Sequence, residues 1–561
     1  MSSTKDYFSL IEDSACSKSG LQPADIESGL AAVTSSPTLF LNDRALYVSV
    51  ILQRFVYTDV DRLSPKAIYL AMGVLKAFGR LINSSDDELV SEKAVGGLLQ
   101  LALSLKTSAC ASYGKASETN YALDACNEAL TCVANAMLLQ PTSRAHMAKC
   151  DGFKTISEIL CSILATNATS AFLCGRCLLL SLVTEENARH CVKELYLQVV
   201  LAQTISIFLD RQRSGFVAPS DRFTPEQVMA ELFKAAMSLC VYFQRSVRHG
   251  PSKQDNKDDS LPPKQAVEFA DLLKVSLATL NQLKLADDHL TDSAKQAASI
   301  ALNFPTKAPD SIRAIWLPAS NKWKNLDSIY ELFKAIVGQI FGGSPTGSDD
   351  KDKVLLSVSE LYQNELTPLA LILVRLMSEH SDARLRIFHQ VYPQNANIDY
   401  SLLPEDRPGI SARIVRLMRV PQGGMLPGAM GDFLLAVLGH DVKQFIMGVG
   451  YGNAAGYMFA RGIEMPADAL DQASASVDAG GMTVDPITGC SLNQTDIDRE
   501  LANMTEEEKE REAERLFVLF ERLNRTGFIK ADNPVRAAVE SGRFQEIPDD
   551  GNSESRNSSS N

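Results

Sequence analysis

The sequence has few tryptophans and histidines and no long uninterrupted apolar run. Its 561 residues include 2 tryptophans and 7 histidines. The best apolar candidate, residues 433–449, is interrupted by His440, Asp441 and Lys443, so no segment reaches the roughly 20 apolar residues of a membrane-spanning helix. The opening residues MSSTKDYFSL lack a basic stretch followed by an apolar core, which disfavours a secretory signal. These absences predict a cytosolic protein.

Positive charge is also in short supply. There are 55 lysines and arginines against 68 aspartates and glutamates, a formal net charge of −13. Binding of nucleic acid needs concentrated lysine and arginine to neutralise phosphates, so we expect no nucleic-acid partner. The 11 cysteines are an odd number scattered through apolar segments, which favours reduced, buried thiols over a disulfide framework.

Motifs for metal, nucleotide or nucleophilic chemistry are incomplete or missing. Cys174, Cys177 and His190 approach a zinc-finger spacing, but both cysteines lie in the apolar segment FLCGRCLLLSLV, which favours buried thiols. The glycines of GYGNAAG imitate a dinucleotide fingerprint without the strand that should precede it. Neither a phosphate-binding loop nor a G-x-S-x-G elbow is present. We therefore expect no catalytic residue, no metal and no cofactor.

The pattern that is present is helical. From about residue 65 to 460, apolar residues recur at intervals of three and four, as Leu130, Val133 and Met137 do. So many successive short helices predict stacked repeats of the armadillo or HEAT type, in which neighbours share a continuous core. The predicted fold is all-α, with a helical-repeat solenoid over residues 1–462.

The C-terminal part has a different composition. Residues 463–503 are rich in Ala, Ser, Asp and Gly, which predicts a flexible linker. Thr505 and Glu508 form a capping box that predicts an amphipathic helix over residues 504–530, followed by a mostly disordered tail over 531–561. This helix could dock on the solenoid or on a partner, and its apolar side chains are Leu516, Phe517, Leu519 and Phe520.

A few polar side chains within apolar helices are candidates for recognition. Lys76 and Arg80 are four residues apart, so both lie on one helix face and could bind an acidic group. The amide of Asn135 could donate to and accept from a bound peptide. Arg384 and its neighbour Arg386 offer further charge. For each of these residues, an ordinary surface or helix-turn role is the alternative.

Several segments in order resemble one known family. The stretch 432–462, in which GYGNAAG is followed by ARG, is the most specific, and 484–489 and 504–529 follow it. Upstream, 366–393 is similar as well. Together these segments resemble the synembryn family, cytosolic proteins that fold and activate the α subunits of heterotrimeric G proteins. The motif positions, which we expect to be structural, are Gly450, Tyr451, Gly452, Asn453, Gly456 and Arg461.

The resemblance implies a folding chaperone and receptor-independent guanine nucleotide exchange factor for G-protein α subunits (Gα). Family members prefer GDP-bound or nucleotide-free Gα, hold its C-terminal helix in the solenoid groove, and release it when GTP binds. An exchange factor of this kind has no chemical active site. We expect a monomer in the cytoplasm, with recruitment to the plasma membrane or cell cortex left open.

The resemblance also suggests which residues contact Gα. Lys76 and Arg80 resemble a basic pair on an early helix, Asn135 an amide of the next repeat, and Arg384 a basic residue later in the groove. The C-terminal apolar side chains at 516–520 would clasp the GTPase domain. Ser381 and Leu385 depart from the family pattern, because relatives often carry basic residues there, which weakens the anion site around Arg384.

Two other functional classes remain open. An armadillo-type adaptor that binds peptides without promoting exchange is the main alternative. Such carriers usually show regular Trp–Asn pairs along the groove, whereas Trp316 and Trp323 do not form that pattern. An enzyme on a helical scaffold is disfavoured by the missing nucleophile and metal ligands.

Overall fold

The chain is represented by a computed structural model in which all described segments are helices, turns or loops. The described residues are 23–57, 63–82, 84–106, 120–162, 167–218, 221–248, 261–282, 289–306, 309–341, 358, 360–393, 402–420, 424–463, 504, 505, 509 and 511. Contacts divide the chain into one unit over Met1–Pro466 and another over Ala467–Asn561. The predicted all-α solenoid class is confirmed for the first unit.

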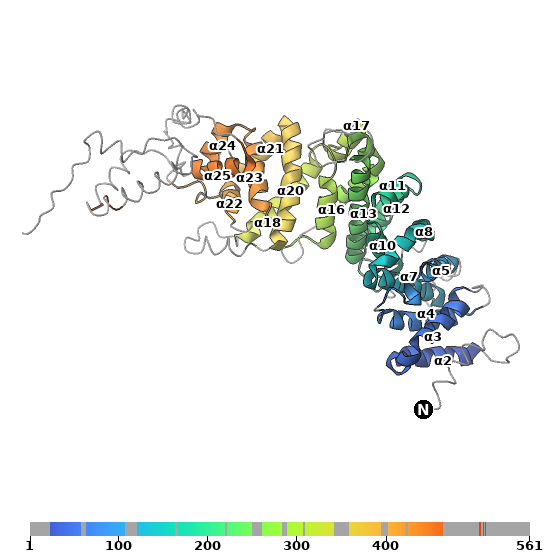
Figure 1. Ribbon diagram of the computed structural model, residues 1–561. Helices are drawn as coiled ribbons and strands as arrows, with labels where there is room; N and C mark the ends of the chain where they lie inside the picture. Colours follow the sequence, from blue (N-terminus) through green and yellow to red (C-terminus); the bar gives the residue numbers. More distant parts are fainter. Residues whose placement is uncertain are drawn as a thin grey trace, which may run out of the picture. The chain divides into compact units, whose positions relative to one another are not determined.

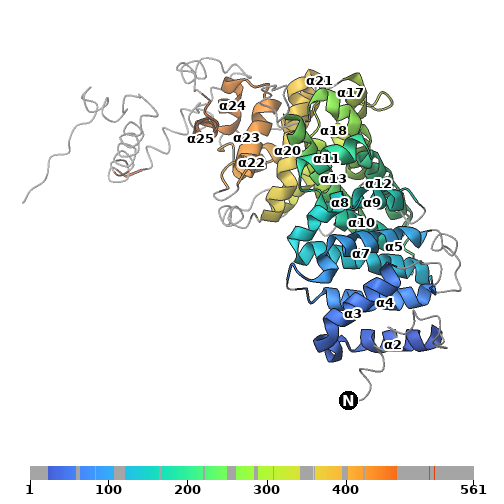
Figure 2. The same cartoon turned by 45° about the vertical axis from the view of Figure 1, so that its right-hand side comes forward.

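The helices of the first unit form two rows, and Figures 1 and 2 both show successive helices side by side. In the first row, each helix packs against the next. Its members are α2 (Pro23–Ser35), α4 (Pro65–Gly79), α7 (Tyr121–Leu139), α10 (Ala168–Ser181), α13 (Pro225–Arg248), α16 (Asp292–Leu302), α20 (Glu360–Glu379), α23 (Leu426–Val437) and α25 (Tyr451–Arg461).

The second row covers one side of the first. For example, α5 packs on α7, α12 on α13 and α18 on α20. The members of this row are η2 (Leu52–Val56), α5 (Glu92–Ser104), α9 (Gly152–Leu160), α12 (Leu197–Ser214), α15 (Ala270–Leu280), α18 (Lys324–Ile340) and α22 (Ile410–Leu417).

Shorter helices connect the rows. They are η1 (Pro37–Asp43), α3 (Arg44–Ile51), η4 (Glu88–Val90), η5 (Pro141–Ala145), α8 (His146–Lys149), α11 (Glu185–Lys193), α14 (Pro263–Ala266), η7 (Val267–Phe269), α17 (Asp310–Trp316), α21 (Ser381–Val391) and α24 (Val442–Val449). No single helix within the described ranges is long and apolar enough to span a membrane, although α11 and α12, bent by 75°, pass that test together.

Polar residues in the connections determine where the first-row helices begin. Ser64 accepts a hydrogen bond from the Ala67 N–H at the start of α4 (3.1 Å). Asn167 does the same for the Ser170 N–H at the start of α10 (2.9 Å). Each side chain satisfies a backbone donor that the first turn of a helix leaves without a partner.

The core lies between and within the rows. In α7, Ala125, Ala129 and Ala136 are fully buried, and such small side chains allow neighbouring helices to approach closely. Large side chains fill the space between rows: the ring of Phe333 on α18 lies 4.9 Å from that of Phe433 on α23, centroid to centroid. Isolated helices of this length are marginal in water, so burial against neighbours supplies their stability.

Candidate partner-binding surface

The first-row helices α4 and α7 run parallel, side by side. The rings of Tyr69 and Tyr121 lie 5.8 Å apart, centroid to centroid. Seven residues later in both helices, Lys76 Nζ lies 2.7 Å from Glu128 Oε2. Because residues seven apart share a helix face, this alignment puts the two pairs along one surface of the row.

Three of the predicted partner-binding residues belong to this surface. Arg80 caps the C-terminal end of α4, four residues after Lys76 and on the same side. Asn135 follows Glu128 by seven residues on α7. Arg80 is exposed and Asn135 is half-buried, and neither side chain makes a hydrogen bond or ion pair with the residues that the structure describes. Their donors therefore remain available to a ligand, whereas Lys76 is already paired.

Glu128 is the buried centre of this surface. Its carboxylate is only 2 % exposed, and it pairs with Lys76 and also with Arg222, whose Nη2 lies 2.9 Å from Oε1. A buried carboxylate is costly without partners, so the two cations stabilise it. Burial raises the pKa of Asp124, one turn earlier, and the positive charge of Arg222 opposes that rise.

The same arrangement recurs further along the first row. Glu231 on α13 is 2 % exposed and pairs with Arg176 on α10, Nε to Oε1, at 2.5 Å. Lys234, one turn later on α13, lies 3.7 Å from the other carboxylate oxygen. Glu231 thus takes a cation from the preceding first-row helix, as Glu128 does from α4.

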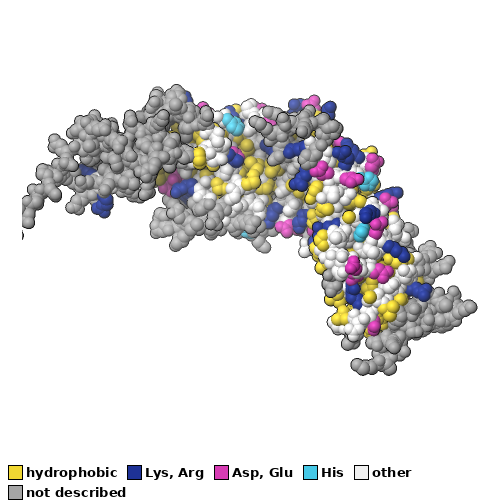
Figure 3. Space-filling view, in the orientation of Figure 1, with side chains coloured by type: hydrophobic (Ala, Val, Ile, Leu, Met, Phe, Trp, Pro, Cys, Tyr) yellow, Lys and Arg dark blue, Asp and Glu magenta, His cyan; other side chains and the backbone are white. Residues whose placement is uncertain are grey.

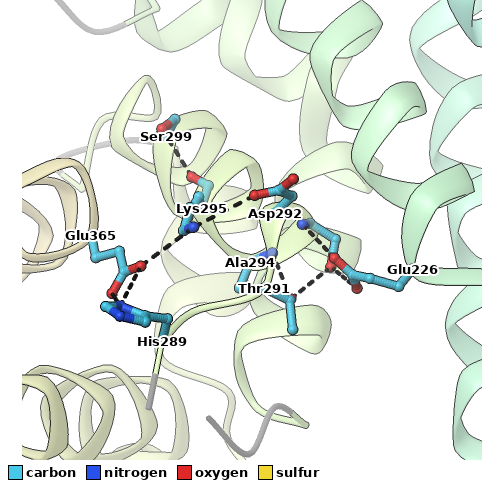
Figure 4. A network of polar contacts seen from close by, with 9 residues as sticks. Glu226, His289, Thr291, Asp292, Ala294, Lys295, Ser299 and Glu365 are labelled. Atoms are coloured by element: carbon cyan, nitrogen blue, oxygen red, sulfur yellow. Dashed lines mark hydrogen bonds and ion pairs between the residues drawn. The ribbon is translucent and has the colours of Figure 1, made fainter. Parts of the chain in front are cut away.

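A third buried carboxylate lies at the packing of α16 against α20. Glu365 on α20 is fully buried, with Lys295 Nζ of α16 and His289 Nδ1 both 3.3 Å from its Oε1 (Figure 4). Ser293 lies at the start of α16, and its N–H and hydroxyl donate hydrogen bonds to Glu226 of α13 (2.8 and 2.6 Å). Carboxylates therefore link α13, α16 and α20 through specific polar contacts.

Sequence reasoning missed these carboxylates. The available signal was a glutamate at a position that the helical period assigns to the core, such as Glu128 in NEALTCVANA. The sequence did not indicate which cation would pair with such a glutamate, because the partners lie on other elements of the chain. Figure 3 shows apolar side chains and charges of both signs interspersed on one face of the molecule.

Arg384 does not join the group formed by Lys76, Arg80 and Asn135. It lies on α21, which packs against α20 and α23, and α10, α13 and α16 separate it from α7 along the row. Its guanidinium Nη1 lies 3.4 Å from the position that a Cβ atom would occupy at Gly439, so the Arg384 side chain lies close to this glycine. Arg386, in contrast, is bound at both oxygens of Asp327 on α18 (2.6 and 2.9 Å).

Comparison with known proteins places the chain in a family. A family model described as guanine nucleotide exchange factor synembryn matches residues 71–543. The chain belongs to the synembryn family. A synembryn-like chaperone of Schizosaccharomyces pombe is 29% identical over 198 residues, which cover 33% of this chain and 36% of the relative.

Two further synembryn relatives match over similar lengths. A protein named chaperone ric-8 from Caenorhabditis elegans is 26% identical over 202 residues, 35% of each chain. Chaperone Ric-8A of Bos taurus is 30% identical over 190 residues, which cover 31% of this chain and 35% of the relative. The matched region therefore spans about a third of the length of these curated relatives.

The predicted family motif GYGNAAG lies at the junction of α24 and α25. Gly450 is the N-cap residue of α25 and has a φ of +81°, a conformation that favours glycine, and Asn453 donates from Nδ2 to the Val449 carbonyl (2.8 Å). Arg461 forms an ion pair with Asp432 of α23. Burial raises the pKa of Tyr451. A side chain at Gly452 or Gly456 would meet open space.

The remaining candidates are a C-terminal helix and a cysteine cluster. Leu516, Phe517, Leu519 and Phe520 lie outside the described residues, and nearby the Lys509 N–H donates to the Thr505 carbonyl (3.0 Å). Cys174 and Cys177 are fully buried on α10, and burial raises the pKa of Cys177 to about 12. Within the described ranges, no group of three or more His, Cys, Asp or Glu side chains could hold a metal ion.

Proposed function

We propose that this synembryn-family protein is a folding chaperone and receptor-independent guanine nucleotide exchange factor for Gα subunits. The family model, whose description names that exchange activity, supports this proposal, as do the relatives named as chaperones. The observation that carries it here is the α4–α7 surface, where the side chains of Arg80 and Asn135 make no hydrogen bond with other described residues.

The proposed ligand on this surface is the C-terminal helix of Gα. A row of parallel helices offers a groove for such a helix, and the guanidinium of Arg80 can bind a terminal carboxylate with two hydrogen bonds. Asn135, with donor and acceptor on one amide, suits the exposed backbone at a helix end. Lys76, held by Glu128, adds charge at a fixed position.

Nucleotide exchange then requires only that the protein binds nucleotide-free and GDP-bound Gα with different affinities. If the protein binds nucleotide-free Gα more tightly than GDP-bound Gα, GDP must bind the complex more weakly by the same factor. A difference of about 1.4 kcal/mol corresponds to a factor of ten. GTP completes the cycle by favouring the form of Gα that the protein releases. No side chain of this chain has to perform chemistry.

Arg384 and the C-terminal apolar side chains extend the proposed interface. Arg384 supplies a cation further along the solenoid, and Leu516, Phe517, Leu519 and Phe520 would cover apolar surface of the GTPase domain. A chain ending at Asn503 should therefore bind the isolated C-terminal peptide of Gα normally but lose the ability to prevent aggregation of Gα. Normal protection of Gα by this shortened chain would disprove the role of the C-terminal residues.

The decisive experiment is GTPγS uptake by purified GDP-loaded Gα, with and without the protein. We expect the protein to accelerate uptake. The variant Arg80→Glu should reduce this acceleration at least tenfold, because a glutamate at this position would repel the terminal carboxylate of Gα that Arg80 is proposed to bind. The matched control is Arg213→Glu on α12, which changes charge equally but removes only an exposed pair with Asp210. Peptide binding without acceleration for any Gα would favour the adaptor alternative instead.

A further inference from the structure

The connection between α12 and α13 contains three consecutive residues that together contact α7, α10 and α12. We name Asp221, Arg222 and Phe223 the clasp. The Asp221 side chain is fully buried, and its Oδ2 lies 2.5 Å from Nη2 of Arg211 on α12. Its Oδ1 also accepts the Ala168 N–H at the start of α10 (3.2 Å). Asp221 therefore fixes the clasp between two helices.

The other two residues of the clasp, Arg222 and Phe223, contact α7 and α10. The Arg222 N–H donates to Thr169 Oγ1 (3.3 Å), while its guanidinium reaches Glu128 on α7. The ring of Phe223 stacks on that of Phe172 on α10, with centroids 3.8 Å apart and planes inclined by 12°. The clasp thus brings one arginine and one aromatic pair next to the α4–α7 surface.

Both groups keep capacity for a ligand. Arg222 is 46% exposed, and only Nη2 of its guanidinium is used at Glu128 among the contacts of the described chain. A guanidinium carries five N–H donors, so several remain. The rings of Phe172 and Phe223 are only partly buried. Arginine and aromatic residues are enriched among those that dominate binding energy at protein interfaces, and here an exposed arginine lies beside partly exposed rings.

The distance between the clasp and the predicted anchors fits a single bound helix. Arg222 pairs with Glu128, whereas Asn135 lies seven residues further along α7. Seven residues of α-helix span about 10 Å. A ligand helix lying along α7 can therefore reach both positions.

We propose that the clasp is a second anchor for Gα, which takes an apolar side chain on the Phe172–Phe223 pair and a neighbouring carboxylate on Arg222. This inference rests on the proposed function and names further residues of the same site. Glu128 and Asp221 are positioning residues: Glu128 holds Arg222 and Lys76 at a fixed separation, and Asp221 holds the connection that carries Arg222 and Phe223.

The test measures the affinity of the full-length protein for GDP-loaded Gα and for a labelled C-terminal Gα peptide. Arg222→Gln and Phe223→Ser should each weaken binding of Gα about five- to thirtyfold, the range of interface anchors. Arg222→Lys should recover part of the loss, since it keeps the charge without the forked geometry. Arg213→Gln on α12 is the matched control and should change affinity less than twofold.

A double-mutant cycle tests the positioning role of Glu128. Glu128→Gln should weaken binding in the wild-type background but have no further effect on affinity when Lys76→Gln and Arg222→Gln are already present. Its effect on the unfolding midpoint should change with the background, because the buried carboxylate destabilises the fold once both cations have been replaced. An equal loss of affinity in both backgrounds would show that Glu128 acts through the fold alone and would overturn its positioning role.

The outcomes separate this inference from the proposed function. Phe223→Leu, which keeps apolar volume, guards against loss of folding in Phe223→Ser, and unfolding midpoints are measured for every variant. If wild-type protein binds Gα while Arg222→Gln and a folded Phe223→Ser variant bind equally well, the clasp is not an anchor and the proposed function stands. If wild-type protein binds no Gα, both proposals fall.

Discussion

At the scale of single residues, buried carboxylates hold specific cations, and this distinguishes residues that look equivalent in the sequence. Lys76 and Arg80 are neighbouring cations on one helix face, yet only Lys76 is held by a buried partner, Glu128. Arg80 is exposed, without a polar side-chain contact in the described chain. Substitution of Lys76 therefore combines a binding effect with a folding effect, whereas substitution of Arg80 isolates binding.

Asp221 provides the residue-scale prediction. Asp221→Ala removes a buried carboxylate and leaves Arg211, whose side chain is 11% exposed, without that partner. Breaking one side of a buried pair costs about 3–5 kcal/mol. We expect a clear fall in the urea midpoint. The control Asp210→Ala removes a carboxylate that is 65% exposed and should leave the midpoint nearly unchanged. Equal midpoints for both variants would contradict this account of Asp221.

At the scale of helices, α23 and α25 approach closely at Gly431. A side chain added at Gly431 on α23 would lie 2.2 Å from the ring of Tyr457 on α25. Tyr457 is also fixed by its hydroxyl, which donates to Asp432 (2.5 Å), and burial and this hydrogen bond raise its pKa. The ring therefore has little freedom to move aside.

This contact predicts opposite effects for two glycines. Gly431→Ala should lower the free energy of unfolding by about 1–3 kcal/mol, the typical cost of overpacking. Gly456→Ala on α25 meets open space and should raise it by up to about 1 kcal/mol, because alanine favours the helix. Thermal unfolding of both variants tests this prediction. An unchanged free energy of unfolding for Gly431→Ala would show that α23 and α25 can move apart without cost.

At the scale of the whole first unit, each first-row helix contacts mainly its neighbours in the two rows. Stability in such an array is approximately a sum of local terms. Leu434→Ala, at a fully buried position on α23, should cost about 2–5 kcal/mol. Hydrogen exchange should rise in α20, α23 and α25 and stay unchanged in α4, α7 and α10. Uniform loss of protection would instead indicate one cooperative unit.

The local features of the chain could be predicted from the sequence. The helical period predicted an all-α solenoid, and polar residues such as Ser64 and Asn167 lie at helix starts as their types favour. The segment around GYGNAAG indicated the family. Each of these signals lies within a short window, because helix formation and capping depend on residues a few positions apart.

The composition of the surface was decided only by tertiary structure. Arg222 and Glu128 are 94 residues apart in sequence, and Phe223 in the connection between α12 and α13 stacks on Phe172 of α10. No periodicity relates such residues, since their contact depends on which helices stack and in which register. The sequence by itself determined the helices, their capped starts and the family. Only the stacking of parallel helices decided that Glu128 would join Lys76 to Arg222, because long-range pairing follows from packing of whole elements.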